Sequence, residues 1–533
     1  MTTVAEPRTR PLVPGELRGD EARNPRAREF PGAAGPAADP HRKFALASLV
    51  VLTLLYGLVE MIPGRFAVTD EVFYKAAGRN WAMTGRFAAP EIVGRFKAGP
   101  PLTEVYFAQP PLYAFLFGLY TKLAGFSPRL CMLYDVLIHL LLVWSCVAVA
   151  RTVFKLPWGF SVLCGVLAFP LGTVGRGDEL GIIFALWGAV AFRSGMPRRS
   201  GALVGGAMLG LCCATCLGAF VFLGPLAALE LLRGKQTIRE RISSFCAAAA
   251  AGLAAVAACV APILVNHPAA YQQLIGNTRE QSAALSFLTG NGWKATVEFF
   301  QVWKTGFRYG FQYAILAAGL LLFAAVCLWL DESRAADYQR VVPGVVSLGC
   351  LAAALPGKCL YFWFPAVWLL IACVALAAQA SRAMSRARRH LLFAFGAGVW
   401  LAASVLYLQQ KAILWTMPAD QSLDLNTSRL RAEIPPGVAV RTTDFWWALA
   451  DRDRVYDPLF ANPGSDEPEY TVLSGNGSGK PSVPRGMNPE YRTAGMEIAY
   501  DHLNSTPESL FGIPITRSAY GFGAYVLKKK RGG

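Results

Sequence analysis

Charged residues are scarce in this chain. Only 16% of its 533 residues are Asp, Glu, Lys or Arg, whereas 54% are hydrophobic and the mean hydropathy is +0.36. A soluble protein of this length needs far more charged surface, so the composition predicts an integral membrane protein. The net charge of +16 is scattered over short loops and forms no basic stripe with interleaved aromatic residues, which argues against binding to nucleic acid.

Common cofactor and metal motifs are missing as well. The sequence contains no zinc-ligand spacing, no phosphate-binding glycine loop, no dinucleotide fingerprint and no carboxylate cluster that predicts a complete cation site. The twelve cysteines all lie within or beside apolar runs, so we expect no disulfide framework, and Cys212, Cys213 and Cys216 are expected to pack between helices. We therefore predict no metal site and no required cofactor, and leave the need for a divalent cation open.

Apolar runs long enough to cross about 30 Å of hydrocarbon recur between residues 44 and 410. They predict an all-α polytopic membrane domain with eleven transmembrane helices at 44–62, 130–150, 157–174, 179–193, 201–215, 217–232, 243–265, 307–330, 341–356, 360–379 and 390–410. The apolar segment 110–126 begins with two prolines and contains Lys122. We expect it to be a helix lying in the membrane interface, within a first outer loop at 63–129.

Basic residues predict the orientation. With eleven spans, Lys and Arg gather in the loops on the side of the N-terminus, which the positive-inside rule makes cytoplasmic. Residues 1–43, rich in Arg, Pro and Gly, are predicted to be a disordered cytoplasmic tail. The loop 63–129 and residues 411–533 then lie on the extracytoplasmic side of the cell inner (plasma) membrane, which the chain crosses many times.

The segment 411–533 predicts a small extracytoplasmic α/β domain. Residues 434–456 are typical of a strand, a short helix and a second strand, and Tyr470–Leu473 and Gly523–Leu527 indicate further strands. The Gly-, Ser- and Pro-rich stretch Gly475–Gly486 predicts a mobile loop.

Two adjacent carboxylates, Asp70 and Glu71, follow directly after the first apolar run. Carboxylates are costly near hydrocarbon and tend to be kept there for function, so this pair is the first place to expect chemistry. Farther into the membrane domain, Asp135 and His139 stand four residues apart on one predicted helix face. Such a pair suggests a proton path or a substrate contact, but helix–helix hydrogen bonds are the interpretation that we favour for these two side chains.

The order Asp70-Glu71, Tyr74, Gly, Pro and then Gln109-Pro110-Pro111-Leu112-Tyr113 resembles the first outer loop of GT-C membrane glycosyltransferases. The branch it resembles contains the protein O-mannosyltransferases and the lipid A aminoarabinose transferases (glycosyltransferase family 39-like). Three later segments are similar to further motifs of that family. They are Arg176-Gly177-Asp178-Glu179, the Gly-rich helical pair Gly201–Leu232, and Leu355–Pro365, which contains Lys358 and Tyr361.

The resemblance spans residues 44–410 and implies a GT-C-like fold with interfacial helices in the first outer loop. It implies transfer of a sugar from a polyprenyl-phosphate donor to a hydroxyl of a glycan, lipid or protein. In that family an acidic residue of the first outer loop is the catalytic base. By position this residue is Asp70, with Glu71 as a supporting group.

This chemistry also makes physical sense of the other candidate residues. The leaving phosphate needs cations, and Arg176 and Lys358 are placed to supply them. A carboxylate is needed to accept the proton of the acceptor hydroxyl, and a single displacement inverts the anomeric centre. Tyr74 and Tyr361 have rings suited to a half-apolar boundary and are expected to line the donor site, and Tyr106 is a further candidate for this lining.

The remaining substrate-binding candidates are Asp178, Glu179 and Gln109. Gln109 stands where relatives often carry Lys, which argues mildly against an acceptor rich in phosphate. Two other classes stay open: a transporter or flippase of lipid-linked sugars, which needs no catalytic base, and a noncatalytic membrane scaffold that displays residues 411–533.

Overall fold

The computed structural model describes residues 42–61, 69–92, 99–171, 175–233, 236–281, 312–329, 338–354, 359–416, 423–442, 445–450, 454–456, 468–474, 496–504, 509–510, 513–514 and 522–529. The predicted tail, up to residue 41, and the predicted mobile loop Gly475–Gly486 lie outside this part of the chain.

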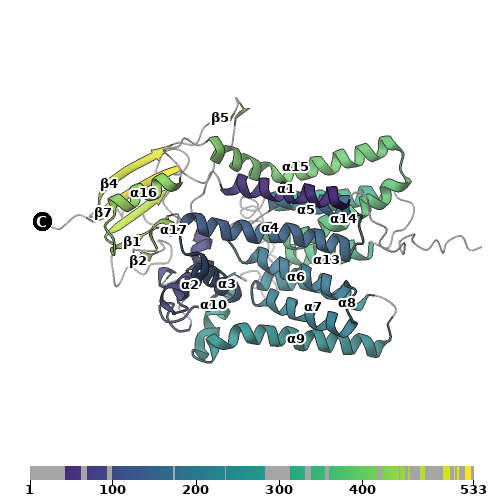
Figure 1. Cartoon of the computed structure of the whole chain (residues 1–533), viewed down its shortest axis with the longest axis horizontal. Helices are drawn as coiled ribbons and strands as arrows, with labels where there is room; N and C mark the ends of the chain where they lie inside the picture. The colour runs from purple at the N-terminus through teal and green to yellow at the C-terminus, as the bar shows by residue number, and fades with distance from the viewer. Residues whose placement is uncertain are drawn as a thin grey trace, which may run out of the picture.

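A bundle of long helices forms the body of the molecule (Figure 1). Each of the eleven apolar segments predicted to span the membrane contains a helix. These helices are α1 (Arg42–Met61), α4 (Pro128–Thr152), α5 (Trp158–Ala168), α6 (Asp178–Arg193), α7 (Arg198–Cys213), α8 (Leu217–Leu232), α9 (Ile238–Leu264), the helix Gln312–Trp329, α13 (Tyr338–Ala354), α14 (Trp363–Ala383) and α15 (Arg386–Thr416).

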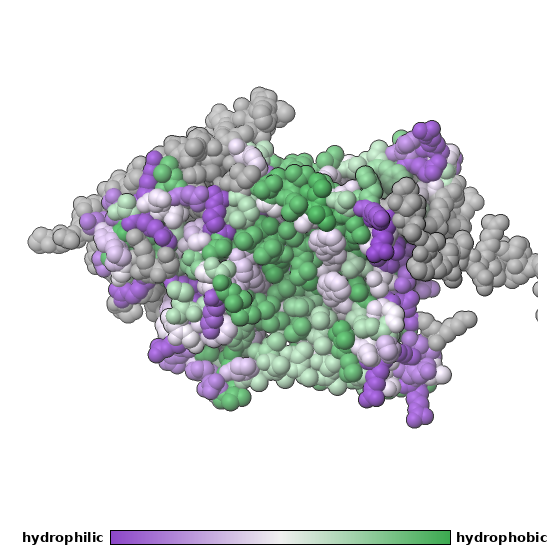
Figure 2. Space-filling model, viewed as in Figure 1, coloured by the Kyte–Doolittle hydropathy of each residue, from purple (hydrophilic) through white to green (hydrophobic). Residues whose placement is uncertain are grey.

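Five segments of the described chain are long and apolar enough to cross a membrane by length and composition. They are α1, α4, α9, Gln312–Trp329 and Cys359–Ser381. The face of the bundle seen in Figure 2 is a broad hydrophobic band with hydrophilic residues at both ends. Helix α1 shows why, because Phe44, Leu54 and Leu58 are all more than half exposed. Such a band suits contact with lipid and is too large for a water-exposed surface.

Several predicted helix boundaries were wrong by a few residues. Helix α15, for example, continues to Thr416, past the predicted end of that span at 410. Helix α9 begins at Ile238 and not at 243, because Thr237 and Glu240 form a reciprocal capping box at its start. Apolar content alone misses such polar first turns.

Short helices from the segment before α4 cover the end of the bundle at which α4 begins. Helix α2 (Thr69–Thr84) is followed by the 3₁₀ helix η1 (Pro90–Ile92) and by α3 (Leu112–Ala124). With 13 residues, α3 is shorter than the roughly 20 residues that a spanning helix needs. It packs along α2.

A small mixed sheet forms the C-terminal region, at the same end of the bundle as α2 and α3 (Figure 1). Its strand order is β2-β1-β3-β7-β4, with β1 parallel to β2 and β3 and with β7 antiparallel to β3 and β4. The elements are α16 (Leu423–Glu433), β1 (Ala439–Arg441), α17 (Trp446–Leu449), β2 (Arg454–Tyr456), β3 (Tyr470–Ser474), β4 (Met496–Asn504), the pair β5 (Ser509–Leu510) and β6 (Ile513–Pro514), and β7 (Phe522–Lys529).

The predicted strand, helix, strand order of residues 434–456 is present as β1, α17 and β2, and both further predicted strands are present as β3 and β7. Strand β4 was not predicted. Its sequence interrupts apolar residues with Glu497, Asp501 and His502, so it lacks a continuous apolar run.

Close contact between α2 and α3 depends on two glycines. A Cβ at Gly78 would lie 1.9 Å from the carbonyl oxygen of Ala114, and one at Gly118 would lie 2.6 Å from the carbonyl oxygen of Gly78. The two backbones therefore touch with no side chain between them.

We expect Gly78→Ala to lower the free energy of unfolding by about 1–3 kcal/mol, the usual cost of overpacking. Gly159→Ala in α5 is the matched control, since its Cβ would meet nothing within 4 Å. Thermal unfolding of both purified variants in the same detergent measures the difference. Equal stability of the two variants would contradict the close crossing of α2 and α3.

Candidate active site

Polar side chains from four elements meet where α6 begins. They come from α2, α4, the turn before α6 and the 3₁₀ helix η4 (Cys359–Phe362), at the end of the bundle next to the C-terminal sheet (Figure 1). Three of the segments singled out from the sequence, around Glu71, Arg176 and Tyr361, are therefore brought together although about 290 residues separate the first from the last.

Arg176 is the cation of this meeting point. Its Nε donates to Asp178 Oδ2 at 2.8 Å, and its Nη2 donates to the hydroxyl of Tyr361 at 3.1 Å and lies 3.5 Å from that of Tyr74. Its guanidinium also lies 5.4 Å from the centre of the Tyr74 ring and 5.6 Å from that of the Tyr361 ring. Asp178 thus orients the guanidinium, and the two tyrosines form a half-apolar wall beside it.

A buried group of three charges lies beside this arginine site. Lys75 Nζ lies 2.7 Å from Asp135 Oδ1 and 3.6 Å from Glu71 Oε1, and the side chains of Lys75 and Glu71 are both 0% exposed. Tyr113 hydroxyl lies 3.4 Å from the same Asp135 oxygen. The lysine links α2 to α4, so the direction of Glu71 depends on the position of both helices.

The turn before α6 presses directly against Glu71. Gly175 has a φ of +69°, and a Cβ there would lie 2.1 Å from Glu71 Oε1. A side chain at this position would therefore displace the carboxylate as well as strain the backbone. The segment that carries Arg176 is in this way held against Glu71.

His139 and Glu179 form a separate buried pair behind the arginine site. His139 Nδ1 lies 3.3 Å from Glu179 Oε2, and its Nε2 lies 2.9 Å from the carbonyl oxygen of Phe169. The prediction of helix–helix hydrogen bonds for His139 and Asp135 is confirmed, with different partners for each. Glu179 therefore supports the start of α6, and its neighbour Asp178 is the one that contacts Arg176.

Sequence reasoning missed several residues of this site. Cys216, expected only to pack between helices, donates from its Sγ to Asp178 Oδ1 at 3.3 Å. Lys75 was not singled out, and Tyr113 was noted only as part of the first motif. The spacing of four residues between Glu71 and Lys75 could have predicted an ion pair on α2. Tyr106, considered as a lining residue, instead donates to the Phe73 carbonyl at 2.6 Å and fixes α2.

The C-terminal region closes one side of the buried charges. The ring of Trp447, in α17, lies 4.9 Å from Lys75 Nζ, and Trp446 packs edge-on against Phe126 with ring centres 5.4 Å apart. Both tryptophans are at most 1% exposed. No pattern in the sequence indicates that Trp447 packs against Lys75.

The carboxyl of Glu91, in η1, lies next to Trp446. Burial raises the pKa of its carboxyl, and the neighbouring Arg79, Asn80 and Trp446 partly oppose the shift. Asn80 Nδ2 donates to Glu91 Oε1 at 3.0 Å, and Arg79 lies 3.9 Å from the same oxygen. The first outer loop and the C-terminal region are therefore packed together around this buried acid.

Gln109 lies apart from the arginine site as far as the described contacts show. It is half-buried in the stretch before α3, which α10 (Tyr271–Gln281) holds in place. The amide of Phe107 donates to Gln273 Oε1 at 2.7 Å, and Asn277 Nδ2 donates to the Ala108 carbonyl at 2.7 Å.

Two sequence candidates receive no side-chain description. Asp70 belongs to the first turn of α2, one residue before Glu71, but its side chain lies outside the described part. Lys358 lies in the segment 355–358, which is also outside it, directly before η4. Among the described residues no group of three or more His, Cys, Asp or Glu side chains could hold a metal ion.

Comparison with solved structures finds chains of similar fold. ArnT from Cupriavidus metallidurans, solved with bound undecaprenyl phosphate, matches with a TM-score of 0.51 and 13% identity over 90% of this chain and 97% of ArnT. The oligosaccharyltransferase of Archaeoglobus fulgidus matches with a TM-score of 0.44 and 11% identity over 81% of this chain and 70% of its own. The arabinofuranosyltransferase AftD from Mycobacteria matches with a TM-score of 0.45 and 13% identity over 92% of this chain and 40% of AftD.

The match to ArnT extends over almost the whole of both chains and shows a shared fold. The chain thus shares its fold with ArnT, which confirms at the level of the fold the GT-C-like architecture that the motifs imply. No protein-family model and no curated protein sequence matches it.

Lys75→Met is expected to lower the free energy of unfolding by about 3–5 kcal/mol, because it leaves Glu71 and Asp135 buried without their cation. Asp135→Asn in the same chain removes one of the two uncompensated charges and is expected to restore part of the loss. Thermal unfolding in detergent of both single variants and the double variant measures the coupling. Losses that simply add would show that Lys75 and Asp135 do not interact.

Proposed function

We propose that this chain is an integral membrane glycosyltransferase. It transfers a sugar from a polyprenyl-phosphate donor to an acceptor hydroxyl at the extracytoplasmic face. The single observation that carries the proposal is the oriented Arg176, held by Asp178 between Tyr74 and Tyr361 at the start of α6 and next to the acid pair of α2. The fold shared with ArnT, a protein solved with undecaprenyl phosphate, supports the same class of donor.

The donor phosphate would bind at Arg176. A guanidinium held through its Nε still presents other N–H groups, and these can stabilise the charge that develops on a leaving phosphate. The rings of Tyr74 and Tyr361 suit the first carbons of a polyprenyl tail as well as the phosphate beside them. Lys358, three residues before Tyr361, is the second cation in this proposal.

Asp70 is the proposed catalytic base. It accepts the proton of the acceptor hydroxyl as that oxygen attacks the anomeric carbon, and the phosphate leaves from the opposite face, so the configuration inverts. The full burial of Glu71 and its pairing with Lys75 favour a positioning role for Glu71 and leave Asp70 for the proton transfer. Glu179, paired with His139, has a supporting role at the start of α6.

The C-terminal region would form the acceptor side of the site. Its Trp447 covers the group of buried charges, and its Trp446 packs on the residues that lead from α3 to α4. An acceptor held against this region would approach Asp70 from the side of the C-terminal sheet.

Asp70→Asn is expected to abolish transfer while donor binding is retained, because the amide cannot accept the proton. The loss should be at least about 100-fold, the lower end of what general base catalysis contributes. The measurement is transfer of radiolabelled sugar from a panel of polyprenyl-phosphate sugars to membrane glycans and proteins in reconstituted vesicles.

Glu104→Gln is the control for this experiment, since Glu104 is an exposed carboxylate of the same outer loop. It should transfer at the native rate. Normal transfer by Asp70→Asn would show that another group is the base. If no variant transfers any sugar while labelled lipid crosses the bilayer, the flippase is the better proposal; if neither occurs, the scaffold is.

Trp447→Ala is expected to lower kcat/KM for the acceptor on the order of tenfold, because it removes the ring over Lys75 and opens that side of the site. Trp447→Phe keeps an aromatic face and should retain most of the activity. Equal activity of the native chain and Trp447→Ala would contradict a role of the C-terminal region in the site. Steady-state transfer at varied acceptor concentration, with thermal unfolding of each variant alongside, distinguishes this effect from general misfolding.

A further inference from the structure

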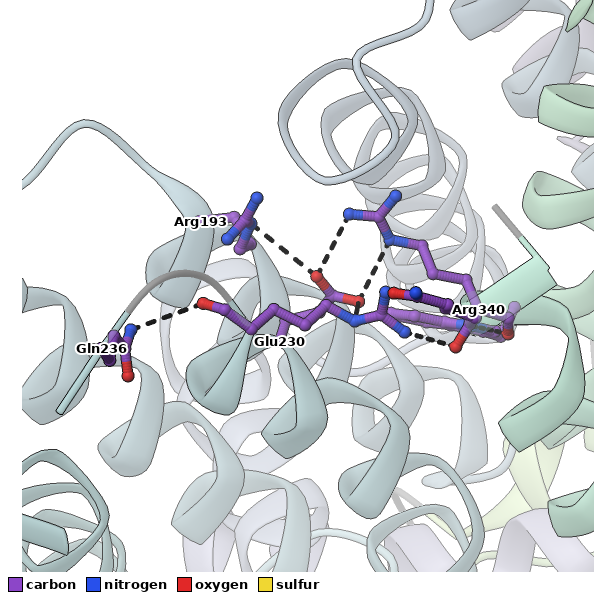
Figure 3. A network of polar contacts seen from close by, with 7 residues as sticks. Arg193, Glu230, Gln236 and Arg340 are labelled. Atoms are coloured by element: carbon purple, nitrogen blue, oxygen red, sulfur yellow. Dashed lines mark hydrogen bonds and ion pairs between the residues drawn. The ribbon is translucent and has the colours of Figure 1, made fainter. Parts of the chain in front are cut away.

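A second group of charges lies at the opposite end of α6 and α8 (Figure 3). We call it the Glu230 cluster: Glu230, Arg193, Arg233 and Arg340. Glu230 is 0% exposed, and its Oε1 lies 2.8 Å from Arg233 Nε and 3.2 Å from Arg340 Nε. Its Oε2 lies 3.4 Å from Arg340 Nη2 and 3.8 Å from Arg193 Nε.

Within the described chain, the Glu230 cluster has three cations around one carboxylate. Arg193 is the most exposed of the three, with 30% of its side chain exposed against 20% for Arg233 and 11% for Arg340, and its Nε is the farthest from Glu230. One face of this guanidinium is therefore held toward Glu230 and the other is open to the surroundings. A planar guanidinium in this position is suited to a phosphate group.

Lys155 adds another positive charge beside the cluster. It is an exposed residue of the turn between α4 and α5, held with a φ of 56°. Partial burial and the positive charges of Arg193, Arg151 and Arg340 lower the pKa of Lys155. This neighbourhood thus has an excess of positive charge, which an external anion would relieve.

Aromatic residues hold one arginine of the cluster in place. The guanidinium of Arg340 lies 5.0 Å from the centre of the Phe154 ring, and Trp368 Nε1 donates to the Arg340 carbonyl at 3.2 Å. The arginine is therefore fixed by aromatic neighbours as well as by Glu230.

Apolar side chains continue from the cluster along the surface of the bundle. Helices α8 and α13 pack against each other and carry Glu230 and Arg340. Next to these charges, Leu229 and Leu232 on α8 are 38% and 37% exposed, and Val342 and Val346 on α13 are 56% and 58% exposed. A ligand with a negative head and apolar chains matches this combination better than a free anion does.

We propose that the Glu230 cluster and Lys155 bind the phosphate of an anionic phospholipid whose acyl chains lie along α8 and α13. Basic pockets between helices at the membrane surface are a known setting for such lipids. The site is independent of the proposed transferase activity, since it lies at the far end of α6 and shares no residue with the active site.

The test uses the full chain, purified in detergent with its lipids removed. Thermal unfolding is followed while dioleoylphosphatidylglycerol or dioleoylphosphatidylcholine is added in mixed micelles. Phosphatidylglycerol should stabilise the native chain more. Arg193→Gln should bind phosphatidylglycerol about fivefold more weakly, which corresponds to about 1 kcal/mol for one cation near an anionic surface. Arg389→Gln, an exposed arginine at the start of α15, is the matched control and should bind like the native chain.

Glu230→Gln separates a lipid site from a purely structural cluster. It removes the internal anion, so it should be less stable without lipid and gain more than the native chain from phosphatidylglycerol. The proposal is overturned if phosphatidylcholine stabilises as well as phosphatidylglycerol, or if Arg193→Gln and Arg389→Gln respond alike. It is also overturned if millimolar inorganic phosphate reproduces the full effect, because the site would then bind anions without a lipid.

Discussion

A lysine that is completely buried must have its charge compensated, and this constraint organises the end of the bundle next to the C-terminal sheet. Lys75 satisfies it with Asp135 of α4 and with Glu71 of its own helix, under the ring of Trp447. An uncompensated charge in such surroundings costs several kcal/mol. The helices α2, α4 and α17 must therefore keep their positions relative to one another. Glu71 in turn determines the position of the turn at Gly175 and, one residue farther on, of Arg176.

The helices α6 and α8 connect the two charged ends of the bundle. Helix α6 begins with Asp178, which orients Arg176, and ends about 24 Å away with Arg193 of the Glu230 cluster. Helix α8 begins after Cys216, a partner of Asp178, and carries Glu230 near its other end. Gly181 allows the two helix starts to approach closely, because a Cβ there would lie 2.8 Å from that of Cys216.

Much of the fold could be predicted from the sequence, since apolar runs and their lengths locate helices without knowledge of their neighbours. Each of the eleven predicted segments contains a helix, and the strands around α17 also follow from local pattern. Strand β4 could not be predicted in this way, because Glu497, Asp501 and His502 interrupt its apolar residues. Polar helix ends, such as the capping box at Thr237, cannot be located from apolar content either.

The sequence by itself determined the membrane class, the helix segments and the motifs around Glu71, Arg176 and Tyr361, because composition, periodicity and motif order are local properties. Only the tertiary structure decided which charges meet. Asp135 pairs with Lys75 and not with His139, Cys216 contacts Asp178, and Trp447 reaches residue 75 from more than 370 positions away. Contacts of this kind depend on how helices pack, and a buried charge takes the partner that packing brings within a few ångströms.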